Sequence, residues 1–308
     1  MEESNKNLKL KIEQLKKEKN CLILAHYYTR KEVQQIADFT GDSLALAQRA
    51  ADNEADMILF AGVRFMAETA KVLSPDKKVL LPVMEASCSL ADSCGAEELK
   101  RMKEQYPDHK VVSYVNTSVE VKALTDVCCT SSNALDVVGS FDKEQKIIFT
   151  PDANLGGFIN NLTGRNMKLW KGACHVHDAV SVKSVEELKA EHPAAKVLVH
   201  PECRAEVVAL ADYAGSTKGI IDYAKNSDSE EFIIVTEPGV MYEIEREAPG
   251  KRFYSISRSN SCVECEYMKM VTLENIYEAL LHEEPVVEID EQVRCAAEKS
   301  IREMLKIK

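Results

Sequence analysis

The sequence contains no hydrophobic run long enough to cross a lipid bilayer, because no apolar stretch approaches the ~20 residues that a membrane-spanning helix needs. It also has no excess of basic residues: 39 Lys and Arg stand against 50 Asp and Glu among 308 residues, and the basic ones form no block. This charge balance argues against nucleic acid or an anionic membrane as the partner. We expect a protein of the cytoplasm, with ample chain for one large core or three smaller ones.

The ten cysteines lack the dense, regular spacing that is typical of small disulfide-bonded secreted domains. We expect reduced thiols that serve metal ligation, catalysis or burial. Only one Cys-x-x-Cys pair is present, Cys262 with Cys265, and the absence of a second pair argues against a zinc ribbon. Five cysteines in or beside apolar segments are predicted to be buried: Cys21, Cys128, Cys129, Cys203 and Cys295.

What the sequence does contain is a threefold repeat with a period close to 87 residues. His26, Tyr114 and His200 are separated by 88 and 86 residues, and each lies at the end of a short apolar run. Other landmarks keep a similar spacing, and chance agreement is the weaker interpretation. These sets are Asp38, Asp126 and Asp212; Ser43, Ser131 and Ser216; and Cys88, Cys174 and Cys265.

Each copy alternates charged amphipathic stretches with short, unbroken apolar runs, which is typical of a parallel sheet covered by helices on both faces. The sequence therefore predicts an α/β protein of three pseudo-repeated three-layer α/β/α domains with short parallel sheets. The predicted domains are 1–95, 96–181 and 182–270, followed by a C-terminal helical segment, 271–308, that packs on the repeats. Ligands gather beyond the carboxyl ends of parallel strands. We thus expect three such edges to meet around a pseudo-threefold axis, with one cysteine from each at the centre.

Hydroxyl residues in each copy are predicted to open helices, because clusters of N-capping residue types precede an amphipathic stretch. The free N–H groups and the positive dipole end of a helix start favour anions. Three equivalent helix starts predict a site for a phosphate or a dicarboxylate without a basic patch. The clusters are Gly41-Asp42-Ser43, Thr130-Ser131-Ser132-Asn133 and Gly215-Ser216-Thr217.

Three thiolates from Cys88, Cys174 and Cys265, with no evident fourth protein ligand, suit two kinds of metal centre. One is a 4Fe-4S cluster with one iron left open, and the other is a zinc ion with an open position. The residues favour the cluster, because catalytic zinc usually recruits imidazole or carboxylate among its three protein ligands. An open iron would act as a Lewis acid toward a substrate hydroxyl or carboxylate.

His26 and His200 occupy the same position in the first and third copies. A single histidine there is usually a satisfied core residue, but two in register at a ligand edge suit proton transfer or anion binding. Glu202 follows two residues later and is a predicted general base, the alternative being an ion pair with Arg204.

Tyr28 and Asn116 hold the position of Glu202 in the other two copies, and Tyr28 is a predicted acid or base. His177 lies three residues after Cys174 and is a predicted donor to the metal ligands or a substrate contact.

Together these motifs resemble the quinolinate synthase family, and they run through nearly the whole chain. Any one of them is weak evidence, whereas the set is highly specific. The motifs are His26-Tyr27-Tyr28, Gly41-Asp42-Ser43, Cys88-Ser89-Leu90-Ala91-Asp92, Tyr114-Val115-Asn116, Thr130-Ser131-Ser132-Asn133, Pro151-Asp152-Ala153-Asn154-Leu155-Gly156, Cys174-His175-Val176-His177, His200-Pro201-Glu202-Cys203 and Cys262-Val263-Glu264-Cys265-Glu266-Tyr267-Met268.

The resemblance implies an enzyme that condenses iminoaspartate with dihydroxyacetone phosphate to give quinolinate, phosphate and two waters for NAD biosynthesis. It implies an oxygen-sensitive 4Fe-4S cluster on Cys88, Cys174 and Cys265, and it leaves Cys262 as a neighbour that is not a ligand. An aspartate-oxidising enzyme is the expected functional partner. The resemblance also implies substrate-contacting or proton-transfer roles for His26, Tyr28, Ser43, Tyr114, Asn116, Ser131, His177, His200, Glu202, Ser216 and Thr217.

One departure from the family pattern is visible: Glu266 stands where many relatives have proline after the last cluster cysteine. This difference puts the predicted shape of the loop around Glu266 in question, but it does not affect the prediction that Cys265 is a metal ligand. Two other functions stay open on the residues alone. They are a cluster-dependent hydro-lyase acting on another hydroxy acid and an iron-sulfur redox sensor.

Overall fold

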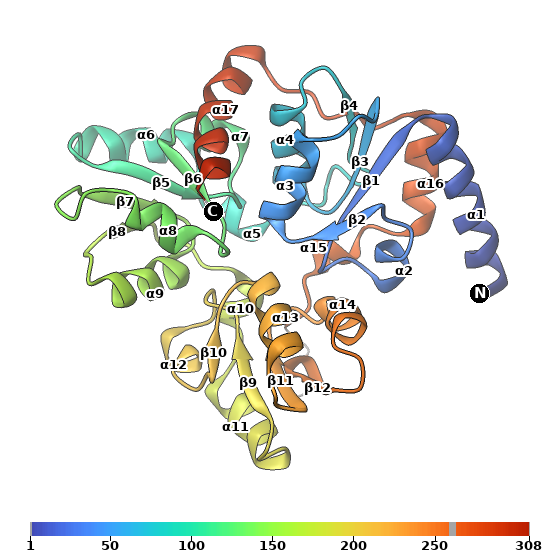
Figure 1. The fold of residues 1–308 in the computed structure, drawn as a ribbon. Coiled ribbons are helices and arrows are strands. Elements are labelled where there is room, and N and C mark those ends of the chain that lie inside the picture. The colour runs from blue at the N-terminus through green and yellow to red at the C-terminus, as the bar shows by residue number, and fades with distance from the viewer. Residues whose placement is uncertain (1, 259–262, 308) are drawn as a thin grey trace.

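The computed structural model describes residues 2–258 and 263–307 and contains three parallel four-stranded sheets (Figure 1). The three sheets share one strand order, in which the second strand lies at one edge, beside the first, and the third and fourth follow. This threefold α/β architecture confirms the predicted fold class. The strands are β1 (Cys21–His26), β2 (Phe39–Gly41), β3 (Met57–Ala61) and β4 (Lys78–Leu80); β5 (Lys110–Tyr114), β6 (Val127–Cys129), β7 (Ile147–Thr150) and β8 (Lys168–Leu169); and β9 (Lys196–Val199), β10 (Tyr213–Ala214), β11 (Glu231–Val235) and β12 (Arg252–Ser255).

The two central strands of each sheet are the apolar runs that the sequence marks. Every residue of β1 and β3 is buried, as expected of strands covered on both faces. The edge strands β4, β8 and β12 were not predicted, because they are short and carry exposed or half-buried residues. The strands of each sheet fall inside one predicted domain, and the domain boundaries themselves stay a prediction.

Helices connect the strands and cover the sheets. The helices of the first unit are α1 (Glu2–Glu18), α2 (Lys31–Gln34), α3 (Ser43–Ala51), α4 (Arg64–Leu73) and α5 (Ser89–Asp92), the last of which follows β4. The second sheet carries α6 (Ala96–Gln105), α7 (Val119–Ala123), α8 (Ala134–Gly139), α9 (Ala153–Thr163) and α10 (His175–Asp178). The third carries α11 (Val182–Glu191), α12 (Ala205–Val208), α13 (Thr217–Asn226), α14 (Val240–Glu247) and α15 (Glu266–Lys269). No helix in these described stretches has the length and apolar character of a membrane span.

The repeated aspartates perform the same task in each sheet. The Asp38 carboxylate accepts a hydrogen bond from the Ile23 N–H at 2.8 Å, and the Asp38 N–H donates to the Ile23 carbonyl at 2.9 Å. Asp126 makes the same pair of bonds with Val111, and Asp212 with Val197. Each aspartate therefore fixes the start of an edge strand against the first strand of its sheet.

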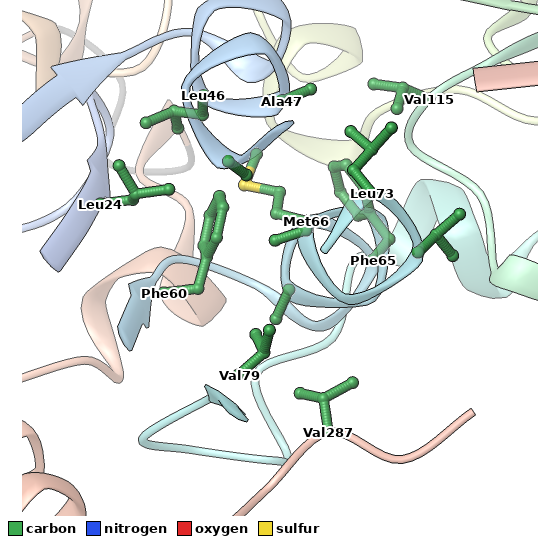
Figure 2. Close-up of a cluster of buried hydrophobic side chains, with 14 of the residues drawn as sticks. Leu24, Leu46, Ala47, Phe60, Phe65, Met66, Leu73, Val79, Val115 and Val287 are labelled. Atoms are coloured by element: carbon green, nitrogen blue, oxygen red, sulfur yellow. The ribbon is translucent and has the colours of Figure 1, made fainter. Parts of the chain in front are cut away.

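One hydrophobic cluster joins the first and second units and the C-terminal segment. Figure 2 shows Phe65 and Met66 of α4 facing Leu24 and Phe60 on one side and Val115 of the second unit on the other. The C-terminal helix α17 (Glu291–Lys306) adds Ala297, Ile301 and Met304 to this cluster. The units are thus held together by shared apolar burial as well as by polar contacts.

The C-terminal helices pack on the repeats. Helix α16 (Leu273–His282) lies against α1, while α17 lies against α7, β6 and α4. Between the two helices, the Val287 N–H donates to the Val79 carbonyl at 2.8 Å.

Each predicted cluster lies before or at the start of a helix, and the way in which the helix start is capped differs between the copies. Asp42 caps α3 by accepting from the Ala45 N–H at 2.9 Å, and Ser216 caps α13 by accepting from the Gly219 N–H at 3.1 Å. In the second copy α8 begins only after Asn133, whose side-chain oxygen accepts from the Thr130 N–H instead of capping the helix. The prediction that Ser43 opens a helix is confirmed, since it is the first residue of α3. The prediction for Ser131 is wrong, because Ser131 lies in the turn before α8, which begins only at Ala134.

Cys295 is a second correction. The side chains of Cys21, Cys128, Cys129 and Cys203 are buried as predicted, whereas Cys295 is exposed. The buried face of α17 carries Ala297, Ile301 and Met304, and Cys295 lies off this face beside Glu291, whose carboxylate accepts from its S–H at 3.2 Å.

Replacing Asp212 with Ala should lower the free energy of unfolding by about 1–2 kcal/mol, because the N–H of the buried Val197 in β9 loses a charged acceptor. Urea unfolding followed by circular dichroism measures the change. The control is Glu186→Ala, at an exposed position of α11 in the same unit. A loss of stability no larger than that of the control would contradict the role given to the repeated aspartate.

Candidate active site

A cavity lies where the three units meet, beyond the carboxyl ends of the central strands. In Figure 1 the short helices α5, α10 and α15 lie near this meeting point. Every predicted site residue except Ser216 lines the cavity. The side chain of Ser216 is engaged as the N-cap of α13, whose first residue, Thr217, does reach the cavity.

The three cysteines in repeat register hold equivalent positions. Cys88, Cys174 and Cys265 each stand directly before a short helix, at the N-caps of α5, α10 and α15, and all three line the cavity. They are half-buried, whereas the other described cysteines are either buried elsewhere or, like Cys295, exposed. Burial raises the pKa of Cys88 to about 12 and of Cys265 to about 11, and it raises the pKa of Cys174 strongly.

His26 and His200 share one hydrogen-bond geometry. The Tyr28 N–H donates to His26 Nδ1 at 3.1 Å, and the Glu202 N–H donates to His200 Nδ1 at 3.3 Å. A backbone N–H can only donate, so Nδ1 is the acceptor and the ring proton of each neutral imidazole lies on Nε2. Burial lowers the pKa of both histidines to about 3, so both rings stay neutral at physiological pH.

Glu202 is the buried carboxylate of the cavity, 3% exposed. Its Oε1 accepts from the Tyr114 hydroxyl at 2.5 Å, and its Oε2 lies 2.9 Å from His177 Nδ1. Burial alone would raise the pKa of Glu202, but the hydrogen bonds from His177 and Tyr114 outweigh it and hold the pKa below its usual range. The ion pair with Arg204 that the sequence left open is not formed, because Arg204 Nε lies 3.4 Å from Glu206 instead.

A chain of hydrogen bonds links Glu202 to Tyr28 through residues of all three units. With Glu202 ionised, His177 Nδ1 carries the proton, so His177 Nε2 accepts from the Thr236 hydroxyl at 2.8 Å. Thr236 then accepts from the Tyr28 hydroxyl at 2.8 Å. Tyr28 in turn accepts from Thr217 at 2.6 Å. The chain therefore has one direction, from Tyr28 toward His177 and Glu202.

The remaining polar residues surround this chain. Tyr114 is also bonded to Ser131, and Ser43 lies at the start of α3 on the cavity wall. Asn116 follows β5 and lines the cavity, and its buried Oδ1 has no hydrogen-bond partner in the described chain. An unpaired buried acceptor of this kind is suited to a donor group of a bound ligand.

Comparisons with known proteins agree with this site. Residues 10–306 match the family model described as quinolinate synthetase A protein. The quinolinate synthase of Microcystis aeruginosa is 49% identical over 298 residues, which cover 96% of this chain and 93% of that protein. The quinolinate synthases of Chloroherpeton thalassium and Synechocystis sp. PCC 6803 are 49% and 48% identical over 96% of the chain and 93% of their own length.

The chain belongs to the quinolinate synthetase A family. The membership predicted from the motifs is confirmed, and so is the prediction of an enzyme, since the relatives carry the name of one. Substrates and the identity of the metal centre are not part of that finding.

The residues of this family member can hold a metal. Cys174, His177 and Glu202 alone bring three ligand atoms within 4.8 Å of one another. Cys88, Cys174 and Cys265 form a softer set, and their raised pKa values mean that the thiolates need a compensating positive charge. A metal centre supplies that charge, and thiolate ligands suit iron-sulfur centres and zinc.

Several residues of the quinolinate synthetase A site were given no role from the sequence, although Asp152 and Asn154 belong to one of the quoted motifs. Asp152 accepts from the Cys174 N–H at 2.7 Å, and Asn154 donates to the Glu202 carbonyl at 3.0 Å. Thr236 and Glu237 directly follow β11, a polar pair after a buried strand, and this position at a carboxyl end was the available signal. Lys269, which pairs with Glu237, gave no signal in the sequence.

The family departure at Glu266 has a simple structural context. Glu266 is the first residue of α15, directly after the N-cap Cys265. Proline is favoured at this position and a carboxylate is favoured by the helix dipole, so both residues allow the same helix start. Cys262 lies outside the described residues.

Lowering the pH from 7 to 5 should reduce the free energy of unfolding partly through His26. The unfolded chain binds a proton on this ring near pH 6.5, whereas the folded chain does so only near pH 3, so stability falls as pH falls through that window, by up to about 1.4 kcal/mol per pH unit. His26→Asn removes this contribution and should flatten the pH dependence. Urea unfolding of both proteins at each pH under anaerobic conditions measures the difference, and parallel curves would contradict it.

Proposed function

We propose that the chain is a quinolinate synthase that condenses iminoaspartate with dihydroxyacetone phosphate, releasing phosphate and two waters. The observation that carries the proposal is the single cavity in which three repeat-related cysteines meet the hydrogen-bonded chain from Tyr28 to Glu202. Family membership supports it, because quinolinate synthase is the name of the relatives. The conversion moves no net electrons, so it needs no oxidant or reductant. The proposed enzyme acts in the cytoplasm, where thiols stay reduced. Its iminoaspartate is supplied by an aspartate-oxidising enzyme.

Cys88, Cys174 and Cys265 would hold a 4Fe-4S cluster. When bound, such a cluster supplies an open iron that acts as a Lewis acid toward a substrate hydroxyl or carboxylate. Zinc is the less suitable occupant, because a centre held by thiolates alone is uncommon among catalytic zinc sites.

The anionic groups of the substrates would be held at helix starts and hydroxyls. The start of α13 offers backbone N–H groups and the Thr217 side chain, and the start of α3 offers Ser43. The Asn116 side-chain oxygen has no partner among the described residues, so it would accept from a donor group of a substrate, and the Tyr114 hydroxyl borders the same space. His26 and His200, with protons on Nε2, can each donate to a substrate oxygen.

Proton transfer would follow the direction of the hydrogen-bonded chain. A substrate proton taken by the Tyr28 oxygen moves the Tyr28 proton to Thr236 and the Thr236 proton to His177 Nε2. The imidazolium that forms is stabilised by the ionised Glu202, 2.9 Å away. Reversing the same steps returns the proton to a leaving hydroxyl. Glu202 thus sets the proton affinity of the chain without touching Tyr28 itself.

Anaerobically purified protein should convert iminoaspartate and dihydroxyacetone phosphate to quinolinate, with one phosphate released per quinolinate. Chromatography of the product and a phosphate assay measure both. Cluster-replete protein that forms no quinolinate would overturn the function. A hydro-lyase or a redox sensor would leave the two carbon skeletons unjoined.

Alanine at Cys88, Cys174 or Cys265 should abolish the retention of iron and labile sulfide, because two thiolates do not hold the cluster. The matched control is Cys94→Ala, a buried cysteine that does not line the cavity. Iron and sulfide counts per chain measure the result. Full iron and sulfide in any one of the three variants would refute this ligand set.

Glu202→Gln should lower kcat by about 10²- to 10⁴-fold, because the amide cannot stabilise a protonated His177. Steady-state rates of quinolinate formation measure the effect. Glu206→Gln, at an exposed glutamate of α12 four residues further along the chain, is the control. A Glu202→Gln enzyme with activity within about twofold of the control would rule out the general-base system.

A further inference from the structure

A buried carboxylate, Glu237, and a half-buried ammonium, Lys269, lie beside the cavity but outside the hydrogen-bonded chain from Tyr28 to Glu202. The Glu237 side chain is 0% exposed and the Lys269 side chain is 14% exposed, and Lys269 Nζ lies 2.8 Å from Glu237 Oε1. A buried ion pair costs desolvation energy and is weak evidence for a stabilising role by itself. The other bonds of the pair indicate what it does.

Glu237 holds the cysteine end of the site. Its Oε1 accepts from the Cys265 N–H at 3.3 Å, and its Oε2 accepts from the Gly239 N–H at 2.6 Å. Cys265 is the N-cap of α15, and Lys269 is the last residue of the same short helix. The carboxylate therefore fixes both ends of the segment that carries the third cysteine.

Lys269 holds the tyrosine end. Its ammonium donates to the Tyr28 carbonyl at 2.6 Å, while the Tyr28 hydroxyl is held by Thr236, the residue before Glu237. A Cβ at Gly239 would lie 2.7 Å from backbone atoms of Tyr28, so the third unit packs directly against the main chain of this residue. Two residues of the third unit therefore hold Tyr28, Lys269 at its carbonyl and Thr236 at its hydroxyl.

We propose that the Glu237–Lys269 pair is a positioning device that couples the placement of Cys265 to that of Tyr28. The inference rests on the proposed function, in which Cys265 holds the cluster and Tyr28 handles the substrate proton. Neither charged group touches the reacting atoms. Both act through the backbone of the residues that do: Glu237 through the N–H of Cys265, and Lys269 through the carbonyl of Tyr28.

The test compares Glu237→Gln, Lys269→Met and the double variant. Each single change should speed anaerobic loss of iron to a chelator about tenfold and lower kcat about tenfold, with KM moved by less than about twofold. The double variant should be within about twofold of the worse single variant, because both changes remove one shared interaction. It also leaves no unpaired buried charge, so it keeps the test valid if a single variant fails to fold.

The matched control is Glu243→Gln, which changes the ion pair between the buried Glu243 and the exposed Arg246, 2.6 Å apart in the third unit. Neither of these residues lines the cavity. Iron loss at the rate of this control, or effects of the two single changes that multiply in the double variant, would overturn the coupling. Iron loss is read without turnover. A wild-type protein that makes no quinolinate would therefore contradict the proposed function but would not affect the iron-loss measurement. Variants that lose iron at the wild-type rate and keep normal activity would contradict only the coupling.

Discussion

Parallel strands bring their carboxyl ends to one edge of a sheet, and the site depends on three such edges facing a common point. His26 is the last residue of β1, Asn116 and Glu202 follow β5 and β9, and the chain after β11 supplies Thr236 and Glu237. No single unit contains a working site, because the bonds from Tyr28 to Thr236 and from Tyr114 to Glu202 cross between units. The relative placement of the units is therefore part of the chemistry.

The second constraint is a buried negative charge. Glu202 sits in a cavity whose wall also holds three thiols, and burial there works against every anionic form. Two hydrogen bonds, from Tyr114 and His177, keep the carboxylate ionised, and the same burial keeps His26 and His200 neutral. The Glu202 carboxylate thus carries the negative charge of the hydrogen-bonded chain, while the neighbouring His26 and His200 rings are held in their neutral forms.

Much of this arrangement follows from sequence periodicity, because landmarks that repeat in a duplicated fold occupy equivalent places. That reasoning located the central strands, the cavity-facing cysteines and Glu202. It could not find Thr236 as the link between Tyr28 and His177, since its partners come from distant segments and meet only through packing. It misplaced Ser131, because the Asn133 side chain accepts from the Thr130 N–H in a turn and α8 begins only at Ala134. The short edge strand β8 lies below the length at which a pattern is readable.

The three histidines of the cavity show how local backbone geometry assigns chemical roles to one residue type. At His26 and His200 a backbone N–H two residues along the chain occupies Nδ1, which leaves Nε2–H as a donor toward a ligand. At His177 the Glu202 carboxylate faces Nδ1, which reverses the tautomer and makes Nε2 the acceptor of the Thr236 proton. The first two rings can hold substrate oxygens, and only the third can receive a proton and be stabilised in its charged form. The partner of Nδ1 therefore decides whether a histidine can bind a ligand oxygen or receive a proton. Glu202 supplies both kinds of partner, because its backbone N–H donates to His200 Nδ1 and its carboxylate faces His177 Nδ1.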